Sequence, residues 1–216
     1  MRRATLLNIL PSGARRLTLP LLLSVLLPQG AAVAGVVDIE RTTDGIPHIR
    51  AQNWRDLGRG IGYAQAEDAL CTLAEGFLTY AGGRSREFGG DGRPASSSML
   101  GRPTNRELDF FFRAFATRDA VRSWQQHQPA QLDALAEGYA AGYSQYLQQA
   151  RQGSTKVHHR ACLEQTWVRP ITAADVVRRM LAAQWGGGLV HFIAPLVAAA
   201  APVDGQAGVD AAPADD

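Results

Sequence analysis

The sequence has a single lysine, Lys156, although lysine and arginine together number 22 and aspartate and glutamate 20. The basic residues are therefore almost all arginines, and they are scattered along the chain. With a formal net charge of +2, nothing suggests the concentrated positive surface that neutralises a phosphate backbone. This argues against nucleic-acid binding, and the 46% hydrophobic content is typical of a globular protein with one core.

Short motifs that carry chemistry are also missing. The chain has no GxSxG elbow, no Walker loop, no HExxH pair and no GxGxxG after a predicted strand. None of the histidines stands at a metal-ligand spacing with another ligand on a predicted helix; they are His48, His127, His158, His159 and His191. We therefore expect no metal site and no catalytic residue in this chain.

Two polar features remain as weaker candidates. His48 follows a tight Gly-Ile-Pro segment, where a structural hydrogen bond is the favoured role. Glu67 and Asp68 are adjacent carboxylates, which in principle suit a general base or a calcium ligand. On a helix, sequence neighbours point about 100° apart, so we expect one to be solvated and the other buried against an arginine.

No apolar run is long enough for a permanent membrane anchor. The run 17–27 has 11 residues, whereas a span needs about 20. It follows four arginines and precedes Pro28 and the small residues of 32–34, which predicts a signal peptide over residues 1–34. Paired Arg15 and Arg16 would suit twin-arginine export, but their neighbours fit general secretion better. The protein is therefore expected to be periplasmic or secreted.

Cysteine is scarce, with only Cys71 and Cys162. Export to an oxidising compartment favours a disulfide between them, and two unrelated buried thiols are the alternative. Closing a loop this long stabilises by about 4 kcal/mol, provided that the Cα atoms lie within about 7 Å.

Strand and helix signals occupy the region 35–201, which we interpret as one domain. Alternation over 36–41 and 46–51, with Asp44-Gly45 between, predicts a hairpin with a tight primed turn. Asn53 opens a long helix over 57–80, and Gly82-Gly83 ends it. The Gly-, Pro- and Ser-rich stretch 89–105 is a predicted loop.

Two aromatic helices follow that loop. The first contains Phe111, Phe112 and Phe115, and the second begins at Pro129 and has a tyrosine and leucine stripe typical of a core. Gly138 and Gly142 lie on neighbouring turns of the second helix, where another helix can approach closely.

The last predicted helices lie near the end of the domain. Residues 167–171 are extended, Thr172 and Asp175 open a helix to about 185, and the apolar segment 189–201 predicts a buried or pocket-lining helix that needs a partner surface. The Ala-, Gly-, Pro- and Asp-rich tail 202–216 predicts disorder.

Several of these segments resemble the penicillin acylase family, in the branch of acyl-homoserine lactone acylases and aculeacin-type acylases. The likeness rests on "DGIPHI" at 44–49 followed closely by "GYAQAED" at 62–68, and it continues in the family's order. The later segments are 84–85, 87–89, 111–113 and 167–172, so that the likeness covers residues 36 to 200.

The resemblance implies a mainly α fold with a short N-terminal β-hairpin, the α-chain portion of an αββα N-terminal-nucleophile hydrolase. Such enzymes are exported precursors, cut so that a serine begins a separate β-chain and attacks the amide of an acyl substrate. No serine here matches that nucleophile, so the isolated chain is expected to be inactive. The implied partners are that β-chain and a small acyl amide; no cofactor is implied, except that calcium binds the assembled enzyme in some relatives.

By position in that resemblance, Phe111, Trp185 and Phe192 are our candidates for contacts with the acyl group, with plain core packing as the alternative. The tail would correspond to the start of a spacer peptide between the chains. A different function also fits the sequence, namely a non-catalytic periplasmic helical protein whose apolar C-terminal segment docks another subunit.

Overall fold

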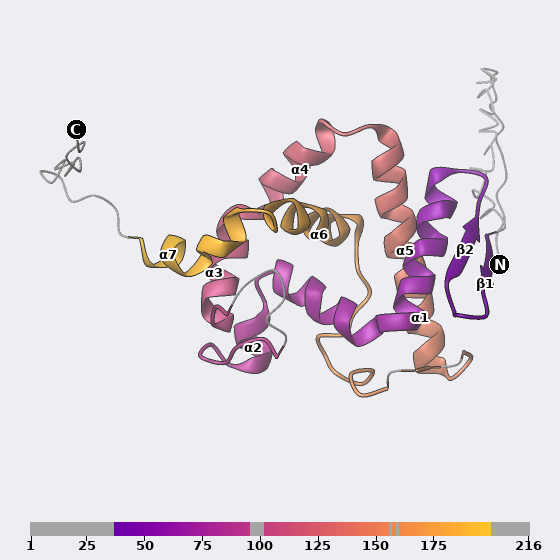
Figure 1. The fold of residues 1–216 in the computed structure, drawn as a ribbon, viewed down its shortest axis with the longest axis horizontal. Helices are drawn as coiled ribbons and strands as arrows, with labels where there is room; N and C mark the ends of the chain where they lie inside the picture. Colours follow the sequence, from indigo (N-terminus) through magenta and orange to yellow (C-terminus); the bar gives the residue numbers. More distant parts are fainter. Residues whose placement is uncertain (1–36, 96–101, 156, 159, 200–216) are drawn as a thin grey trace, which may run out of the picture. The chain divides into compact units, whose positions relative to one another are not determined.

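The computed structural model describes residues 37–95, 102–155, 157–158 and 160–199. The predicted signal peptide and the predicted tail 202–216 lie outside the described residues. The described part is mostly helical with one two-stranded hairpin, as the sequence predicts (Figure 1). In chain order its elements are β1 Asp38–Arg41, β2 Pro47–Arg50, α1 Trp54–Tyr80, α2 Arg84–Phe88, α3 Asn105–Phe115, α4 Arg118–Gln126, α5 Ala130–Gln152, α6 Ala173–Trp185, the 3₁₀ helix η1 Leu189–Phe192 and α7 Ile193–Ala198.

The hairpin forms where predicted, but its turn differs from the prediction. The strands pair antiparallel, with Asp38 opposite Arg50 and Arg41 opposite Pro47. Gly45 N donates to Thr42 O, which places Gly45 after the two central turn residues, at φ 82°. The connection is thus a β-turn followed by a left-handed glycine, and the predicted two-residue primed turn is wrong.

Helix α1 begins and ends as its sequence predicts. The Asn53 side chain accepts from the Asp56 N–H at 2.9 Å, which satisfies one of the free donors of the first turn. At the other end Gly82, at φ 66°, donates to Thr79 O while Gly83 donates to Leu78 O. This pair of bonds is a Schellman cap, and a glycine adopts the required conformation without steric cost.

The middle of α1 has a bend that the sequence does not announce. Ala69 leaves the helical region at φ −148° and ψ 42°, and the helix changes direction there (Figure 1). The half before the bend lies beside α5 and the hairpin, and the half after it runs toward α3. One helix therefore supports two regions of the fold.

Glycines allow α1 and α5 to touch backbone to backbone. A Cβ placed on Gly58 or Gly62 would overlap the carbonyl oxygen of Leu135 or Tyr139, and the predicted pair Gly138 and Gly142 meets carbonyls of α1 in the same way. On the other side of α1, a Cβ on Gly60 would lie 2.5 Å from Ile49 Cγ2 of the hairpin. Because residues four apart share a helix face and residues two apart do not, these glycines seat α5 and the hairpin on opposite sides of α1.

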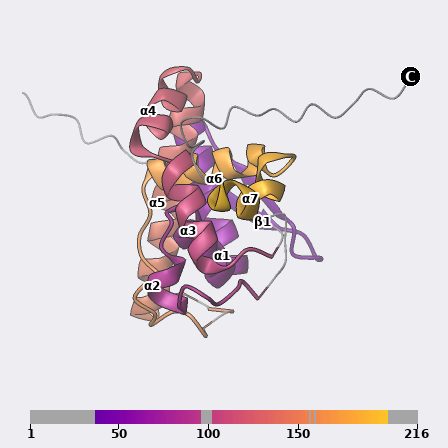
Figure 2. The same ribbon diagram turned by 90° about the vertical axis from the view of Figure 1, so that its left-hand side faces the viewer.

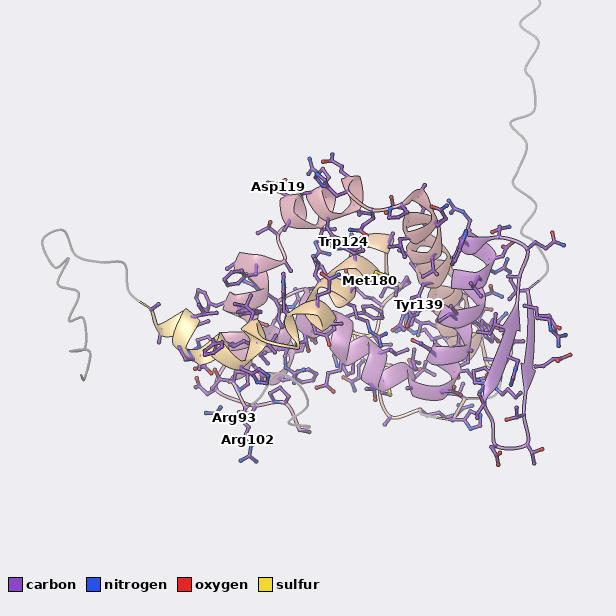
Figure 3. All side chains as sticks on the ribbon, turned by 45° about the horizontal axis from the view of Figure 1, so that its top comes forward. Arg93, Arg102, Asp119, Trp124, Tyr139 and Met180 are labelled. Carbon is purple, nitrogen blue, oxygen red and sulfur yellow. A yellow bond between two sulfur atoms is a disulfide. The ribbon has the colours of Figure 1, made fainter. Side chains whose placement is uncertain are left out.

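Aromatic side chains fill the core around this crossing. Phe77 meets Tyr139 and Tyr143 edge to face, with ring centroids 6.4 and 5.5 Å apart, and Tyr63 meets Tyr146 at 5.4 Å. The predicted tyrosine stripe of α5 is therefore buried as core. Figure 3 shows Tyr139 of α5 and Met180 of α6 among the side chains packed between these helices, with Trp124 of α4 above them and Asp119 at the outer side.

Two short helices, α2 and α4, were not predicted. Helix α4 has an N-cap, since the Thr117 hydroxyl accepts from the Ala120 N–H at 3.1 Å, but it buries only Val121 fully. Helix α2 has five residues and begins directly after the cap of α1. Both are too short and too polar for a periodic apolar pattern to identify them.

A disulfide joins Cys71 and Cys162, the predicted pair, with the Cα atoms 5.6 Å apart. It closes a loop of 91 residues and ties the segment before α6 to α1, two residues beyond the bend. Arg151 of α5 holds the same segment, because its guanidinium donates to Val168 O at 2.6 Å and to Leu163 O at 3.2 Å. The chain leading into α6 is therefore fixed to both long helices.

Within the described ranges, no single helix has the length and apolar character needed to cross a membrane; α6 together with residues 189–198 reaches both only as a pair bent by 83°.

We predict that Gly142→Ala destabilises the full chain by more than about 3 kcal/mol, because the added methyl group would overlap the Arg59 carbonyl and force the helices apart. Urea denaturation followed by circular dichroism measures this. The control is Gly76→Ala in α1, whose Cβ would lie an ordinary 3.6 Å from Tyr80 and which should stabilise by about 0.5–1 kcal/mol. Equal effects of the two substitutions would show that the close approach is not needed.

Candidate functional site

An aromatic cluster lies where α3 and α6 meet, at the end of the fold away from the hairpin (Figures 1 and 2). Helix α3 presents the rings because its start is fixed by a capping box. The Thr104 hydroxyl accepts from the Glu107 N–H at 3.2 Å, while the Glu107 carboxylate accepts from the Thr104 N–H at 2.6 Å. Phe111 and Phe112 then face inward and are almost fully buried.

Helix α6 is fixed in the same way, and it ends at Trp185. The predicted capping box is present: Asp175 accepts from the Thr172 N–H at 2.9 Å and also pairs with Arg169 at 3.2 Å. Burial alone raises the pKa of Asp175, but hydrogen bonds and charge from Arg169 and the hydrogen bonds from Thr172 outweigh it, so that its pKa is lowered. The carboxylate therefore holds the start of α6 in its charged form.

Three phenylalanine rings contact the ring of Trp185. Its ring lies edge to face with Phe111 at 5.9 Å and with Phe115 at 6.3 Å, and it stacks on Phe112 at 6.5 Å. Phe115 is partly exposed and Trp185 half-buried, so the outer edge of this cluster is open to solvent. The arrangement offers an apolar surface for binding and has no charged group able to act on a bond.

Two of the three predicted acyl contacts, Phe111 and Trp185, lie together in this cluster. Phe111 is 1% exposed and can only support a surface formed by its neighbours. The third, Phe192, is 59% exposed at the end of η1, whereas its neighbours Val190 and Ile193 are buried in the cluster. Phe192 therefore projects away from the other two candidates within this chain.

The apolar segment 189–201, predicted as a buried or pocket-lining helix that needs a partner surface, is described over residues 189–199 and is not one continuous helix. After the glycines 186–188 it forms the single turn η1 and then the short helix α7. Ile193 is buried against α3, but Phe192 and Leu196 remain exposed. The described residues offer this segment too few apolar neighbours to cover both of its faces.

The paired carboxylates Glu67 and Asp68 both bind Arg41 of the hairpin, at 2.6 and 2.9 Å. The prediction that one is solvated and the other buried against an arginine is confirmed in part: Asp68 is exposed, but Glu67 is only partly buried, and both share one guanidinium. Burial lowers the pKa of Arg41, but the hydrogen bonds and charges of these two carboxylates outweigh burial, so that the pKa is raised overall. Since the cation at this point is the arginine itself, the pair does not fit a calcium site.

The described residues contain no pair of groups suited to nucleophilic catalysis. His48 is exposed on β2, and its ring makes no hydrogen bond with any residue that the structure describes, so the predicted structural bond of this side chain is wrong. No described serine hydroxyl contacts a histidine or a carboxylate; that of Ser144 accepts from Ile171 N at 3.2 Å. No group of three or more His, Cys, Asp or Glu residues in the described ranges could hold a metal ion.

A buried polar network surrounds Arg84 and was not predicted from the sequence. This guanidinium donates to Asn105 at 2.7 Å and to Glu75 at 2.8 Å, and it lies over the Phe88 ring at 4.9 Å. Because Glu75 lies on α1, Arg84 on α2 and Asn105 on α3, the network links these three helices. The one sequence signal for this network is an arginine directly after the Gly82-Gly83 cap. A charged residue after a helix end is normally exposed to solvent, so the sequence did not indicate that this one is buried.

The comparisons with known proteins agree with this fold. The family model described as penicillin amidase matches residues 36–210. Acyl-homoserine lactone acylase PvdQ of Pseudomonas fluorescens is 44% identical over 165 residues, which are 76% of this chain and 20% of that protein. Aculeacin-A acylase of Actinoplanes utahensis is 34% identical over 172 residues, again 76% of this chain and 20% of that protein. The chain thus spans about a fifth of the length of these curated relatives.

A solved structure has the same fold. Thermostable penicillin G acylase from Alcaligenes faecalis aligns with a TM-score of 0.56 and 21% identity, over 72% of this chain and 75% of that chain. The aligned chain of that structure is therefore close to this one in length, whereas the curated relatives are several times longer.

We predict that Asp175→Asn destabilises the full chain by about 1–2 kcal/mol at pH 7, because α6 loses a charged cap. The folded pKa lies below the ordinary 3.8, so the carboxylate stabilises fully above 3.8 and loses that effect as the pH falls through the folded value. The gap between wild type and variant should therefore close over that window in urea denaturation. The control Asp119→Asn, at an exposed position of α4, should change stability by less than about 0.5 kcal/mol. A gap that persists at pH 2 would contradict the role of the charge.

Proposed function

Because the chain belongs to the penicillin amidase family, we propose that it is the α-chain part of an exported amidohydrolase that cleaves linear amides. The substrates would be acyl amides such as acyl-homoserine lactones, lipopeptides or β-lactam side chains, since the relatives are named as acylases of such compounds. The observation that carries the proposal is the family match over residues 36–210, a range that includes every described residue.

In this proposal the nucleophile lies outside the chain. A serine at the start of a β-chain would attack the amide carbonyl, with its own α-amino group as the base. The missing catalytic pair in the described residues fits this division of labour, as does the solved acylase chain of similar length. The present chain would position the β-chain and the acyl group, and alone it would be inactive.

The acyl group would bind at the open edge of the aromatic cluster. Trp185 and Phe115 offer partly exposed rings there, and Phe111 supports them from below. Phe192 and Leu196 extend the apolar surface along α7. An acyl chain gains about 0.8 kcal/mol for each methylene that such a surface removes from water, so cluster size would influence acyl length.

The β-chain would cover the part of η1 and α7 that the acyl group leaves exposed. Neither segment buries both of its faces within this chain, and about four-fifths of each curated relative lies outside the matched region. Export to the periplasm or beyond is supported by the leader sequence and by the disulfide between Cys71 and Cys162. Calcium, if the assembled enzyme binds it, would need ligands beyond the Glu67 and Asp68 pair that Arg41 already holds.

We predict that this chain alone releases no amine from acyl-homoserine lactones of graded length or from penicillin G. The same chain produced together with the coding region that follows it should hydrolyse at least one of them, because the nucleophile is then supplied. Amine release measured by chromatography decides between the outcomes. Hydrolysis by the chain alone that disappears on mutating one of its own side chains would refute the proposal, and the absence of any acylase region downstream would favour a non-catalytic binding protein.

We also predict that Phe192→Ala in the assembled enzyme raises KM for its preferred long-chain substrate by about tenfold while short acyl chains change little, because one apolar contact is lost. Phe192 is 59% exposed in this chain, so the substitution should leave the fold intact. Steady-state kinetics measure the effect. Trp54→Ala, an equally exposed aromatic at the start of α1, is the control and should leave KM unchanged. A uniform loss over all acyl lengths would argue against an acyl contact.

A further inference from the structure

A hollow lies on the side of α3 opposite the aromatic cluster, between that helix and α2. Its volume is about 490 Å³, and its lining includes Ser85, Arg86, Arg106, Asp109, Phe110 and Arg113. Residues 106, 110 and 113 are spaced by four and three, which places them on one face of the helix. Helix α3 therefore presents arginine, phenylalanine and arginine in a row to this hollow, while Phe111 and Phe112 face the core.

Of the three arginines around the hollow, two pair with exposed or neighbouring carboxylates and the third pairs with none that the structure describes. Arg113 donates through Nε to Gly82 O at 2.8 Å, and no carboxylate in the described ranges pairs with it. Arg106 pairs at 2.8 Å with Asp91, but both side chains are well exposed, and Arg86 pairs only with its sequence neighbour Glu87. Exposed pairs of this kind contribute little free energy, so the guanidiniums remain available to a ligand.

Of two buried polar groups that line the hollow, one has hydrogen-bond partners and the other has none among the described residues. The Asp109 carboxylate is buried and already accepts from the N–H groups of Arg84 and Ser85, each at 2.8 Å. The Ser85 hydroxyl is buried too, but it makes no hydrogen bond with any described residue. This hydroxyl has less than 1 Å² of exposed surface, so binding in the hollow depends on the arginines and on Phe110.

We propose that this hollow binds a carboxylate that carries an adjacent apolar group. A guanidinium matches a carboxylate with two parallel hydrogen bonds, and Arg106 and Arg113 flank the site on one helix face. Phe110, which is 62% exposed, lies between them in the row and offers its ring to the apolar group. The volume suits a small organic acid or the side chain of a bound polypeptide. The proposal does not depend on amide hydrolysis by this protein.

Calorimetric titration of the full chain with 3-phenylpropionate, 3-phenylpropionamide and inorganic phosphate tests it. The acid should bind at least about tenfold more tightly than the neutral amide, because only the acid forms charge-assisted bonds. Arg106→Gln and Arg113→Gln should each lower the affinity for the acid by about fivefold or more. Phe110→Ala should lower the affinity for the acid but not the affinity for phosphate. Arg122→Gln, an exposed arginine on α4 paired with Asp119, is the matched control and should bind like wild type.

A second titration, in the presence of the remaining part of the precursor, distinguishes the sources of the carboxylate. Unchanged binding indicates a free organic acid, and competition indicates an acidic side chain of that partner; both support the site. Equal affinity for acid and amide, or wild-type affinity in Arg106→Gln, would overturn it. Arg113→Gln also removes the bond to Gly82 O and could disturb the end of α1. Arg106→Gln does not touch that bond, so it tests the site independently. Circular dichroism checks the fold of each variant.

Discussion

The backbone contact between α1 and α5 is the constraint on which the other parts of this fold depend. Helices normally pack through side chains at 8–10 Å, but here glycines on both helices let carbonyl oxygens occupy the places of Cβ atoms. Gly60, facing the opposite way, lets the hairpin approach just as closely. One short stretch of α1 thus fixes the positions of three layers, namely α5, α1 itself and the hairpin. The bend at Ala69 then directs the rest of α1 toward α3 and the aromatic cluster.

Local chemistry made much of this fold predictable. The caps at Asn53 and Thr172, the Asp-Gly turn region and the Gly82-Gly83 stop each act within a few residues, so the sequence reports them directly. The bend at Ala69 has no such signal, since neither glycine nor proline marks it. It lies between Asp68, which Arg41 holds, and Cys71, which the disulfide holds, and both partners are distant in sequence. Helix α2 is missed for a related reason, because its first N–H groups are satisfied by Asp109 of another helix.

The candidate site shows the same division. Position in the family resemblance suggested Phe111 and Trp185, and the structure brings their rings together. That resemblance could not place Phe192, because the glycines 186–188 end one helix without fixing the direction of the next segment. Sequence neighbours also could not show that Glu67 and Asp68 would share Arg41, because the hairpin that supplies this arginine must first dock on α1.

The distribution of buried polar groups explains how the helices that carry the aromatic cluster are held in place. Arg84 lies buried among Asn105 and Glu75, and Arg151 fixes the approach to α6; each would be costly if its partners moved. These bonds fix the relative positions of α3 and α6, and with them the edge that Phe115 and Trp185 form. A surface whose supporting helices are held in this way loses little entropy on binding, so that within the proposed function this chain supplies a preformed apolar wall.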